Sequence, residues 1–425
     1  MRLLFVILCL AVSCSSAVAE RATFKFLKSV SVSELNAILD TERAEFVRSS
    51  IQGQGYQLPP PSVATNDVNL FTVRYYSRRP EIGGQKVLVS GLLALPKISD
   101  MSTIPLLAFQ HATVMGRYEV PSYAFTPTNP SGYPHYPQAY ESRYMVALFA
   151  GNGYAVMAAD YFGFGDSARL NEAYFMKRST AQANYDLYLD VKKFLRANNI
   201  KPSKFVLGGQ SQGALNTTGF LELLEARGVK VTGAFTAANP NDPYAVMNAI
   251  LFHPRAIDAS WISTLISLTA FSCENYGGKK GLAKSVIDPK YYMSMKSVYD
   301  RTYAGPLGLY SLFVQWQNVP FVEFLHPAYR DPTSFANSDY GRCLAAAETF
   351  RTEFKTPLKM YYSTDDEVVR TKAALLAVDY QSAITSTPDA PESNKISAVS
   401  VQGAGHRLTF VSGAVAAKAW MDTIE

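Results

Sequence analysis

The chain of 425 residues lacks a long hydrophobic run. Its longest, residues 3–12, has ten residues, fewer than the ~18 that a membrane-spanning helix requires. Arg2 precedes this run and small residues at 17–19 follow it, which is the layout of a secretory signal peptide. We therefore expect cleavage after residue 19 and a secreted or periplasmic protein. A lipid anchor at Cys14 is the alternative, although Leu10 stands one position too early for a good lipobox.

Cysteine is also scarce, with four residues in the chain. Cys9 and Cys14 lie in the signal segment, so Cys273 and Cys343 remain after cleavage. Two cysteines in an exported chain suggest one disulfide. Closing a loop of 70 residues would stabilise the fold by roughly 4 kcal/mol on the chain-entropy model. Two unpaired thiols stay open as the alternative, because the sequence does not give their distance.

Concentrated charge and metal-binding motifs are missing too. The net charge is +5, and the lysines and arginines are scattered without a basic stripe, which argues against a nucleic-acid partner. No HExxH, CxxC or spaced-aspartate calcium loop occurs, so we expect neither a metal nor another cofactor. Aromatic residues make up 12% of the chain, which suits a well-packed globular protein rather than a disordered one.

Strand and helix patterns alternate over most of the chain. A helix is expected at 31–48, with Ser31 or Ser33 as its N-cap. The expected strands are 69–77, 85–95, 104–110, 154–160, 204–210, 230–237, 358–363 and 396–402. Helical patterns lie near 138–152, 179–198, 213–227, 370–383 and 408–422. Most of the later strands are short apolar runs, typical of parallel strands buried on both faces. The sequence therefore predicts a mostly parallel, eight-stranded α/β sheet flanked by helices.

The interval 240–350 interrupts this alternation. It contains no convincing strand but two apolar helical stretches, at 255–272 and 307–325. We interpret it as a helical cap inserted into a core of residues 69–239 and 351–425, after an N-terminal extension at 20–68. Apolar helical stripes are usually packing, so the alternative is that these helices simply enlarge the core.

A serine stands at the junction of an expected strand and helix. Gly209-Gln210-Ser211-Gln212-Gly213 matches G-x-S-x-G, in which glycines permit a strained turn that exposes the serine. The pattern alone is weak, but here it follows an apolar strand and precedes a helix, as the motif requires. We therefore predict that Ser211 is a nucleophile, which needs a neighbouring base and an acid to orient that base.

The base and the acid are expected at the carboxyl ends of later strands. Of five histidines, only His406 follows the last strand, in a loop of small residues. His111, His135, His253 and His326 are interpreted as packing or local hydrogen-bonding residues. Asp366 follows the preceding strand, three residues before Val369, and is the predicted acid. Its neighbour Asp365 is the alternative, and an ordinary solvated turn also stays open.

The order Ser211, Asp366, His406 resembles that of the α/β-hydrolase superfamily, over about residues 70–410. The segment 109–113 stands where that family has its oxyanion loop, and 160–167 resembles its D-x-x-G-x-G-x-S turn. The helical insertion resembles the secreted lipase and esterase branch. The resemblance implies an oxyanion hole formed by the backbone N–H groups of Gln212 and of Thr113 or Ala112. Ala112 replaces the family's usual glycine, which restricts this loop slightly.

The resemblance, together with the apolar cap, implies a secreted serine hydrolase, a lipase or carboxylesterase, that cleaves carboxylic esters through an acyl-enzyme. The expected partner is a small-molecule ester or lipid, with transient contact with a lipid surface left open. A serine exopeptidase is the alternative, since Glu274, Asp288 and Glu323 of the cap could hold a free amine. A binding protein that retained the fold, a haloperoxidase and an acyltransferase also stay open.

Overall fold

The structure is a computed structural model that describes residues 21–53, 55–61, 63–126, 139–303, 305–385 and 395–425. The expected signal segment, Cys14 and His135 lie outside these residues. Within them, no helix combines the length and the apolar character needed to cross a membrane.

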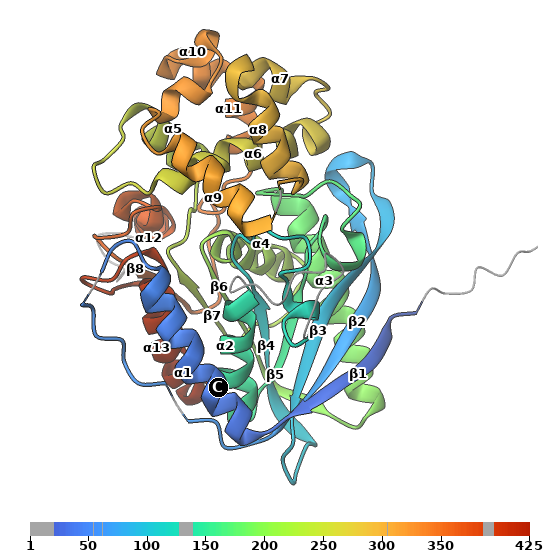
Figure 1. Cartoon of the computed structure of the whole chain (residues 1–425). Coiled ribbons are helices and arrows are strands. Elements are labelled where there is room, and N and C mark those ends of the chain that lie inside the picture. Colours follow the sequence, from blue (N-terminus) through green and yellow to red (C-terminus); the bar gives the residue numbers. More distant parts are fainter. Residues whose placement is uncertain (1–20, 54, 62, 127–138, 304, 386–394) are drawn as a thin grey trace, which may run out of the picture.

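One nine-stranded sheet runs through the molecule, in the order β1-β2-β3-β5-β4-β6-β7-β8-β9 (Figure 1). Its strands are β1 (Thr23–Val30), β2 (Val68–Arg79), β3 (Gln85–Pro96), β4 (Thr103–Gln110), β5 (Ala155–Ala159), β6 (Lys201–Gln210), β7 (Gly233–Ala237), β8 (Leu358–Tyr362) and β9 (Ile396–Ser400). The pairs β1–β2, β2–β3 and β3–β5 are antiparallel. The pairs β5–β4, β4–β6, β6–β7, β7–β8 and β8–β9 are parallel. The predicted mostly parallel sheet is confirmed, but the predicted count of eight was one too low, because β1 adds an edge strand.

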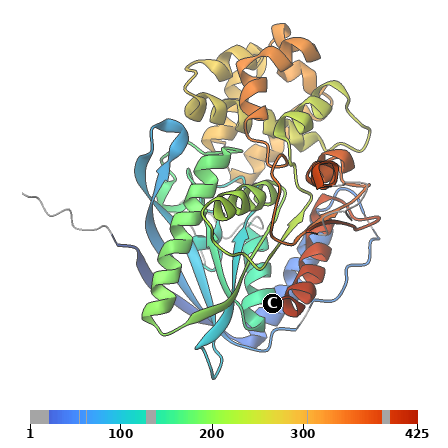
Figure 2. The same ribbon diagram turned by 180° about the vertical axis from the view of Figure 1, so that it is seen from behind.

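Helices cover both faces of the sheet. α1 (Val32–Ser49), α2 (Tyr140–Phe149) and α13 (His406–Thr423) lie on the face toward the viewer in Figure 1, and α3 (Lys177–Ala197) and α4 (Gln212–Ala226) lie on the face seen in Figure 2. α12 (Thr371–Thr385) packs against β8 and β9. In β4, Leu106 and Ala108 join one buried cluster while Leu107 and Phe109 join the other, as the two-residue period of a strand requires. Burial on both faces explains why these strands are continuous apolar runs.

The first helix begins where one of the two expected caps stands. Ser31 accepts a hydrogen bond from the N–H of Glu34, whose carboxylate accepts one from the N–H of Ser31. This reciprocal pair is a capping box, which satisfies two donors that would otherwise lack an acceptor at the helix start. Ser31, rather than Ser33, is therefore the N-cap of α1.

Among the described residues, seven α-helices lie between β7 and β8, over the carboxyl ends of the parallel strands (Figure 1). They are α5 (Pro243–Phe252), α6 (Thr264–Gly277), α7 (Leu282–Val286), α8 (Pro289–Asp300), α9 (Gly305–Trp316), α10 (Pro332–Asn337) and α11 (Asp339–Ala345), and we call them the helical insertion. Cys273 on α6 and Cys343 on α11 form a disulfide within it. Thus the disulfide predicted from the cysteine count is present and ties two helices of the insertion together.

Both apolar stretches of the insertion form shorter helices than expected. In 255–272, the Asp258 carboxylate accepts hydrogen bonds from the backbone N–H and the side chain of Arg255, which fixes a turn, and α6 begins only at Thr264. In 307–325, α9 ends at Trp316, and Pro320, which cannot continue a helix, precedes a short 3-10 turn.

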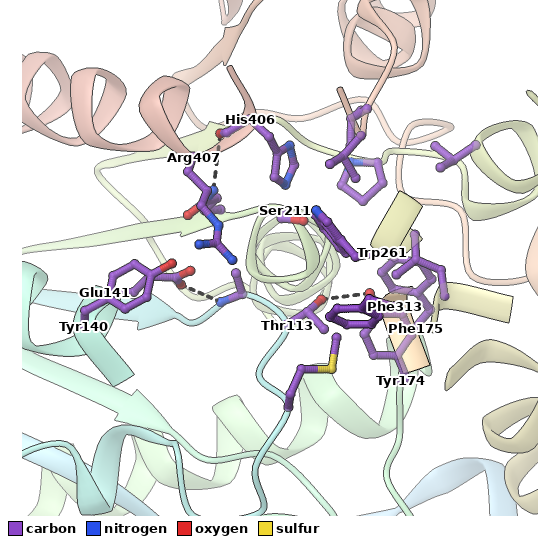
Figure 3. Close-up of a pocket in the computed structure, with 18 of the residues that line it drawn as sticks. Thr113, Tyr140, Glu141, Tyr174, Phe175, Ser211, Trp261, Phe313, His406 and Arg407 are labelled. Carbon is purple, nitrogen blue, oxygen red and sulfur yellow. Dashed lines mark hydrogen bonds between the residues drawn. The ribbon is translucent and has the colours of Figure 1, made fainter. Parts of the chain in front are cut away.

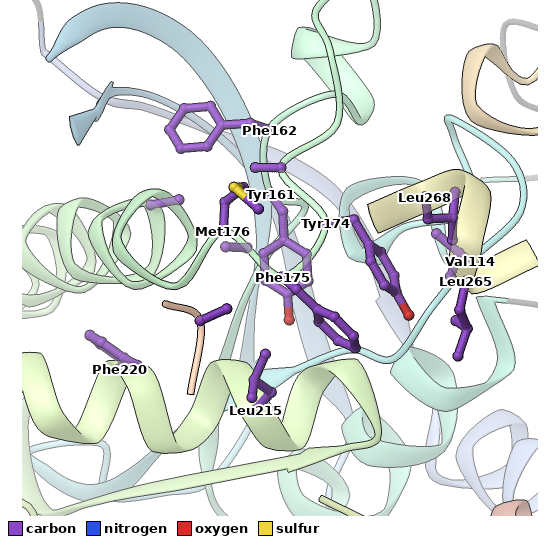
Figure 4. Packing of buried hydrophobic residues seen from close by; sticks show 14 of the residues in the cluster. Val114, Tyr161, Phe162, Tyr174, Phe175, Met176, Leu215, Phe220, Leu265 and Leu268 are labelled. Carbon is purple, nitrogen blue, oxygen red and sulfur yellow. The ribbon is translucent and has the colours of Figure 1, made fainter. Parts of the chain in front are cut away.

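The insertion packs directly on the sheet domain. Leu265 and Leu268 of α6 lie beside Val114 and Tyr174, and all four belong to the buried cluster that also contains Leu215 of α4 (Figure 4). One continuous apolar cluster therefore includes residues of both the insertion and the sheet domain.

Candidate active site

Ser211 occupies the sharp turn between β6 and α4. Its backbone has φ 53° and ψ −120°, a conformation that side chains other than glycine rarely adopt. A Cβ at Gly209 would lie 2.4 Å from the carbonyl oxygen of Gly213, and a Cβ at Gly213 would lie 2.0 Å from that of Gln110. Both glycines are therefore required by close backbone contacts. This is the geometry that the G-x-S-x-G pattern predicts.

His406 and Asp366 meet at the carboxyl ends of β9 and β8. Nδ1 of His406 lies 3.0 Å from both carboxylate oxygens of Asp366. Oδ1 of Asp366 also accepts hydrogen bonds of 2.8 Å from the N–H groups of Val368 and Val369, which fix the carboxylate. Both side chains are almost fully buried. Since Asp366 accepts from Nδ1–H, Nε2 of His406 is left free to accept a proton.

Charges around His406 act in opposite directions. Burial lowers the pKa of the imidazole, but the Asp366 carboxylate and then Glu367 raise it, and the net result is a pKa above its ordinary value. The neighbouring guanidinium of Arg407 lowers it. Glu367 was not singled out from the sequence. Its carboxylate accepts a 2.9 Å hydrogen bond from the backbone N–H of His406 and so holds the start of α13 in place.

The alternative acid, Asp365, faces solvent. Its carboxylate accepts hydrogen bonds from the N–H of Gly403, at 3.1 Å, and from the hydroxyl of Thr364, at 3.2 Å. It makes no contact with His406 in the described part of the chain. Asp366 is therefore the carboxylate that the structure brings to His406.

Ser211 and His406 line the same pocket, which opens between the sheet and the insertion (Figure 3). No hydrogen bond joins the Ser211 hydroxyl to His406 among the described residues. Catalytic hydrogen bonds are often long in structures without substrate and tighten in the complex. The pocket therefore brings these two side chains to one place without a formed hydrogen bond.

The loop after β4 presents backbone groups to this pocket. Ala112 donates its N–H to Oε2 of Glu141 at 2.9 Å, so this N–H is already occupied. The N–H groups of Thr113 and Gln212 have no acceptor among the residues that the structure describes. Of the two expected oxyanion donors on this loop, only Thr113 therefore remains available.

His111 makes local hydrogen bonds with the same loop, as expected. Its Nδ1 lies 2.7 Å from the carbonyl oxygen of Ala112, and its Nε2 lies 3.3 Å from that of Asp160. The ring stacks on Tyr161 with centroids 4.2 Å apart. Burial lowers the pKa of His111 to about 4, so the ring is neutral at neutral pH. Asp160, in the D-x-x-G-x-G-x-S segment, in turn accepts hydrogen bonds from Ser90 and Ser122.

The pocket has two chemically different sides, with Ser211 between them (Figure 3). One side is apolar and combines Tyr174 and Phe175 with residues of the insertion. The insertion contributes Val246, Trp261, Leu265, Leu309 and Phe313. The other side carries Tyr140, Glu141 and Arg407. The cavity volume is about 150 Å³.

Three acids of the insertion were expected to be available for binding a free amine, but none lines the pocket. Glu274 accepts a hydrogen bond from the N–H of Ala283, and Asp288 caps α8. Glu323 lies in a short turn where its carbonyl accepts from Arg330. Among the described residues that line the pocket, Glu141 is the one carboxylic acid. This removes the feature on which the exopeptidase alternative rested.

The remaining histidines lie elsewhere. His253 ends α5, and its carbonyl accepts from Arg370, while His326 caps a short turn through Nδ1. The described residues contain no group of three or more histidine, cysteine or acidic side chains arranged to hold a metal ion.

Comparisons with known proteins agree with this architecture. No protein-family model and no curated protein matches the chain. Among solved structures, the rice cell wall degrading esterase LipA from Xanthomonas oryzae superposes with a TM-score of 0.74, at 18% identity, covering 95% of this chain and 98% of that one. A Legionella pneumophila protein with a provisional assignment as a hydrolase gives 0.74 at 18% identity, covering 94% and 98%. Candida antarctica lipase A gives 0.58 at 15% identity, covering 90% and 77%.

The chain has the α/β-hydrolase fold. The likeness extends over 94–95% of this chain and 98% of each of the two bacterial structures. At identities of 15 to 18%, this likeness concerns the fold, and the chemistry has to be argued from the pocket itself.

Sequence reasoning did not find the polar side of the pocket. Glu141 stands on α2 and Arg407 directly follows the predicted base, yet neither matches a motif. Burial raises the pKa of Glu141 to about 7, against the opposing effects of the Ala112 N–H and Arg407. No local pattern marks Glu141, because Ser142 and Arg143 follow it in the same helix and its partner Ala112 is 29 residues away in the sequence.

Proposed function

We propose that this chain is a secreted serine hydrolase that cleaves carboxylic esters through an acyl-enzyme. Ser211 is the nucleophile, His406 the general base and acid, and Asp366 the residue that orients and stabilises the imidazole. The observation that carries this proposal is the paired 3.0 Å contact between His406 Nδ1 and Asp366 beside a serine held at φ 53°. The α/β-hydrolase fold of esterases and lipases supports it.

The first half of the reaction forms the acyl-enzyme. Nε2 of His406 takes the hydroxyl proton as Oγ of Ser211 bonds to the ester carbonyl carbon. The Asp366 carboxylate favours the resulting imidazolium, in agreement with the raised pKa of His406. His406 then gives the proton to the alkoxide leaving group as the ester C–O bond breaks. Water repeats the sequence and releases the acid.

The negative charge that forms on the carbonyl oxygen needs donors fixed in advance. In the proposal, the N–H groups of Thr113 and Gln212 donate hydrogen bonds to this oxygen. Thr113 follows the loop residue Ala112 and Gln212 follows the turn at Ser211, and both segments are held rigidly. Such donors are typically worth about 3 kcal/mol each when aimed at the transition state. The hydrogen bond from Ala112 to Glu141 and the His111 contacts keep the loop from rotating.

The apolar side of the pocket favours an aromatic or short acyl group. The whole pocket, including its polar side, has a volume of about 150 Å³, and an apolar cavity of that volume holds a molecule about the size of benzene. Leu309 and Phe313 of α9 line this side, so we expect a long fatty acyl chain to fit only if α9 moves away. The insertion then acts as a cap over the site. The disulfide suits the oxidising environment of a secreted protein.

The proposal is tested with purified protein and p-nitrophenyl esters of graded acyl length. We expect the highest kcat/KM with short acyl groups, and Ser211→Ala should abolish both turnover and labelling by a fluorophosphonate probe. Ser102→Ala, at an exposed position away from the pocket, is the matched control and should behave as the unmodified chain. Turnover retained by Ser211→Ala would refute the nucleophile. Cleavage of aminoacyl anilides in preference to esters would assign the protein to the exopeptidases.

A further inference from the structure

Arg407 brings an unpaired positive charge into the candidate active site. It lines the pocket together with Ser211, and its side chain lies on the polar side, facing away from the aromatic residues of the insertion (Figure 3). The guanidinium lies 5.8 Å from the centre of the Tyr140 ring. It forms neither a hydrogen bond nor an ion pair with any residue that the structure describes. The five N–H donors of this half-buried side chain therefore have no acceptor among the described residues.

The position of this charge is unfavourable in two ways, one for the stability of the helix and one for the proposed reaction. Arg407 stands in the first turn of α13, where the helix dipole disfavours a cation. It also lowers the pKa of His406, so it opposes the imidazolium that the proposed reaction must form. Glu141, the nearby acid, does not balance it fully, because burial raises the pKa of this carboxyl to about 7. An anion arriving with the substrate would remove both costs.

We propose that Arg407 is a specificity-determining residue that binds a carboxylate carried by the ester substrate. The substrate class is then an ester with an apolar part on one side of the scissile bond and a carboxylate on the other. The apolar part faces Phe313 and Trp261, and the carboxylate faces Arg407. Guanidinium groups bind carboxylates through two parallel hydrogen bonds, which fixes orientation as well as charge. This inference rests on the proposed esterase function.

Two pairs of esters, each differing only in charge, test the inference. 4-Carboxyphenyl butyrate and 4-carbamoylphenyl butyrate place the group on the alcohol side. Phenyl hydrogen glutarate and phenyl glutaramate place it on the acyl side. We expect the carboxylate member of at least one pair to have a kcat/KM about tenfold higher, the scale of one charge-assisted hydrogen-bonded contact. Arg407→Gln should bring this ratio close to one, and Arg407→Lys should retain part of it.

Arg351 provides the matched control. It is exposed, lies outside the pocket and stacks on Phe350 at 5.1 Å, so Arg351→Gln removes the same charge and a similar ring contact. This variant should keep the ratio of the unmodified chain. A ratio near one for both pairs in the unmodified chain, or an unchanged ratio in Arg407→Gln, would overturn the inference. A neutral sugar ester preferred over both pairs would assign Arg407 to hydroxyl binding instead.

Equilibrium binding separates this inference from the proposed function. In Ser211→Ala protein, calorimetry should show tighter binding of 4-carboxyphenyl butyrate than of its carbamoyl analogue, and adding Arg407→Gln should remove the difference. If the unmodified chain hydrolyses no ester, the esterase proposal fails, and this binding difference alone decides the role of Arg407. Equal binding of the two compounds would reject the carboxylate site even if ester hydrolysis is found.

Discussion

Replacing Gly213 by alanine should uncouple the nucleophile turn from the oxyanion loop. A Cβ at position 213 would lie 2.0 Å from the carbonyl oxygen of Gln110 and 2.7 Å from that of His111. The shorter distance falls about 1.4 Å below the 3.4 Å at which ordinary contact begins, and both opposing atoms are backbone. Either α4 or the loop after β4 must therefore move by about an ångström, and such a displacement of catalytic groups can cost on the order of 100-fold in rate.

The expected effect of Gly213→Ala on the stability of the fold is smaller than its expected effect on the rate. Alanine is favoured over glycine in a helix by roughly 0.5–1 kcal/mol, whereas forced overpacking costs about 1–3 kcal/mol. We therefore expect Gly213→Ala to fold with a modestly lower Tm and to lose about 100-fold in kcat with a short p-nitrophenyl ester. Gly277→Ala is the control, because nothing lies within 4 Å of its added Cβ. An unchanged kcat in Gly213→Ala would show that this contact does not hold the two segments together.

The further predictions concern Glu141, His406 and Asp366. Glu141→Leu leaves the Ala112 N–H buried without an acceptor and should lower kcat more than it raises KM, whereas Glu141→Gln retains an acceptor and should restore most activity. Because burial raises the pKa of Glu141 from 4.5 to about 7, the fold loses stability as pH rises from about 4.5 to about 7, and this loss is fully present above pH 7, so Glu141→Gln should raise Tm more at pH 8 than at pH 5. The pKa of His406 is raised, and protonated His406 cannot act as the base, so kcat/KM should fall as pH decreases through a value above 6.5. In Asp366→Asn, the residual activity should show this fall at lower pH, and an unshifted profile would contradict the assignment of Asp366.

The sequence predicted the parts of the fold that rest on local patterns. Buried parallel strands such as β6 are continuous apolar runs, and the capping box at Ser31 marks the start of α1. β1 was missed because it is an edge strand with one neighbour, mostly exposed or half-buried, and interrupted by Lys25 and Lys28. Its alternating Phe24 and Phe26 were the available signal. Such a strand depends on pairing with β2, which no local pattern specifies.

The same distinction applies to the site. Ser211 could be predicted as a candidate because the strained turn demands glycines at fixed spacing around it, and His406 could be predicted because it follows the last strand. Glu141 could not be identified in this way, since its partner, Ala112, is 29 residues away and only the fold brings them together. Arg407 was equally hidden, because its significance lies in the absence of a partner among the described residues.

The charges around His406 link the reaction to the choice of substrate. Asp366 raises the pKa of the imidazole and Arg407 lowers it, so the proton affinity of the base depends on whether Arg407 is neutralised. A carboxylate bound at Arg407 would strengthen the base only when the matching ester is present. An uncharged ester would leave the guanidinium unbalanced and the imidazolium less stable. The difference between a carboxylate ester and an uncharged ester would then appear in kcat as well as in KM. The reason is that a carboxylate bound at Arg407 also stabilises the imidazolium that develops in the transition state.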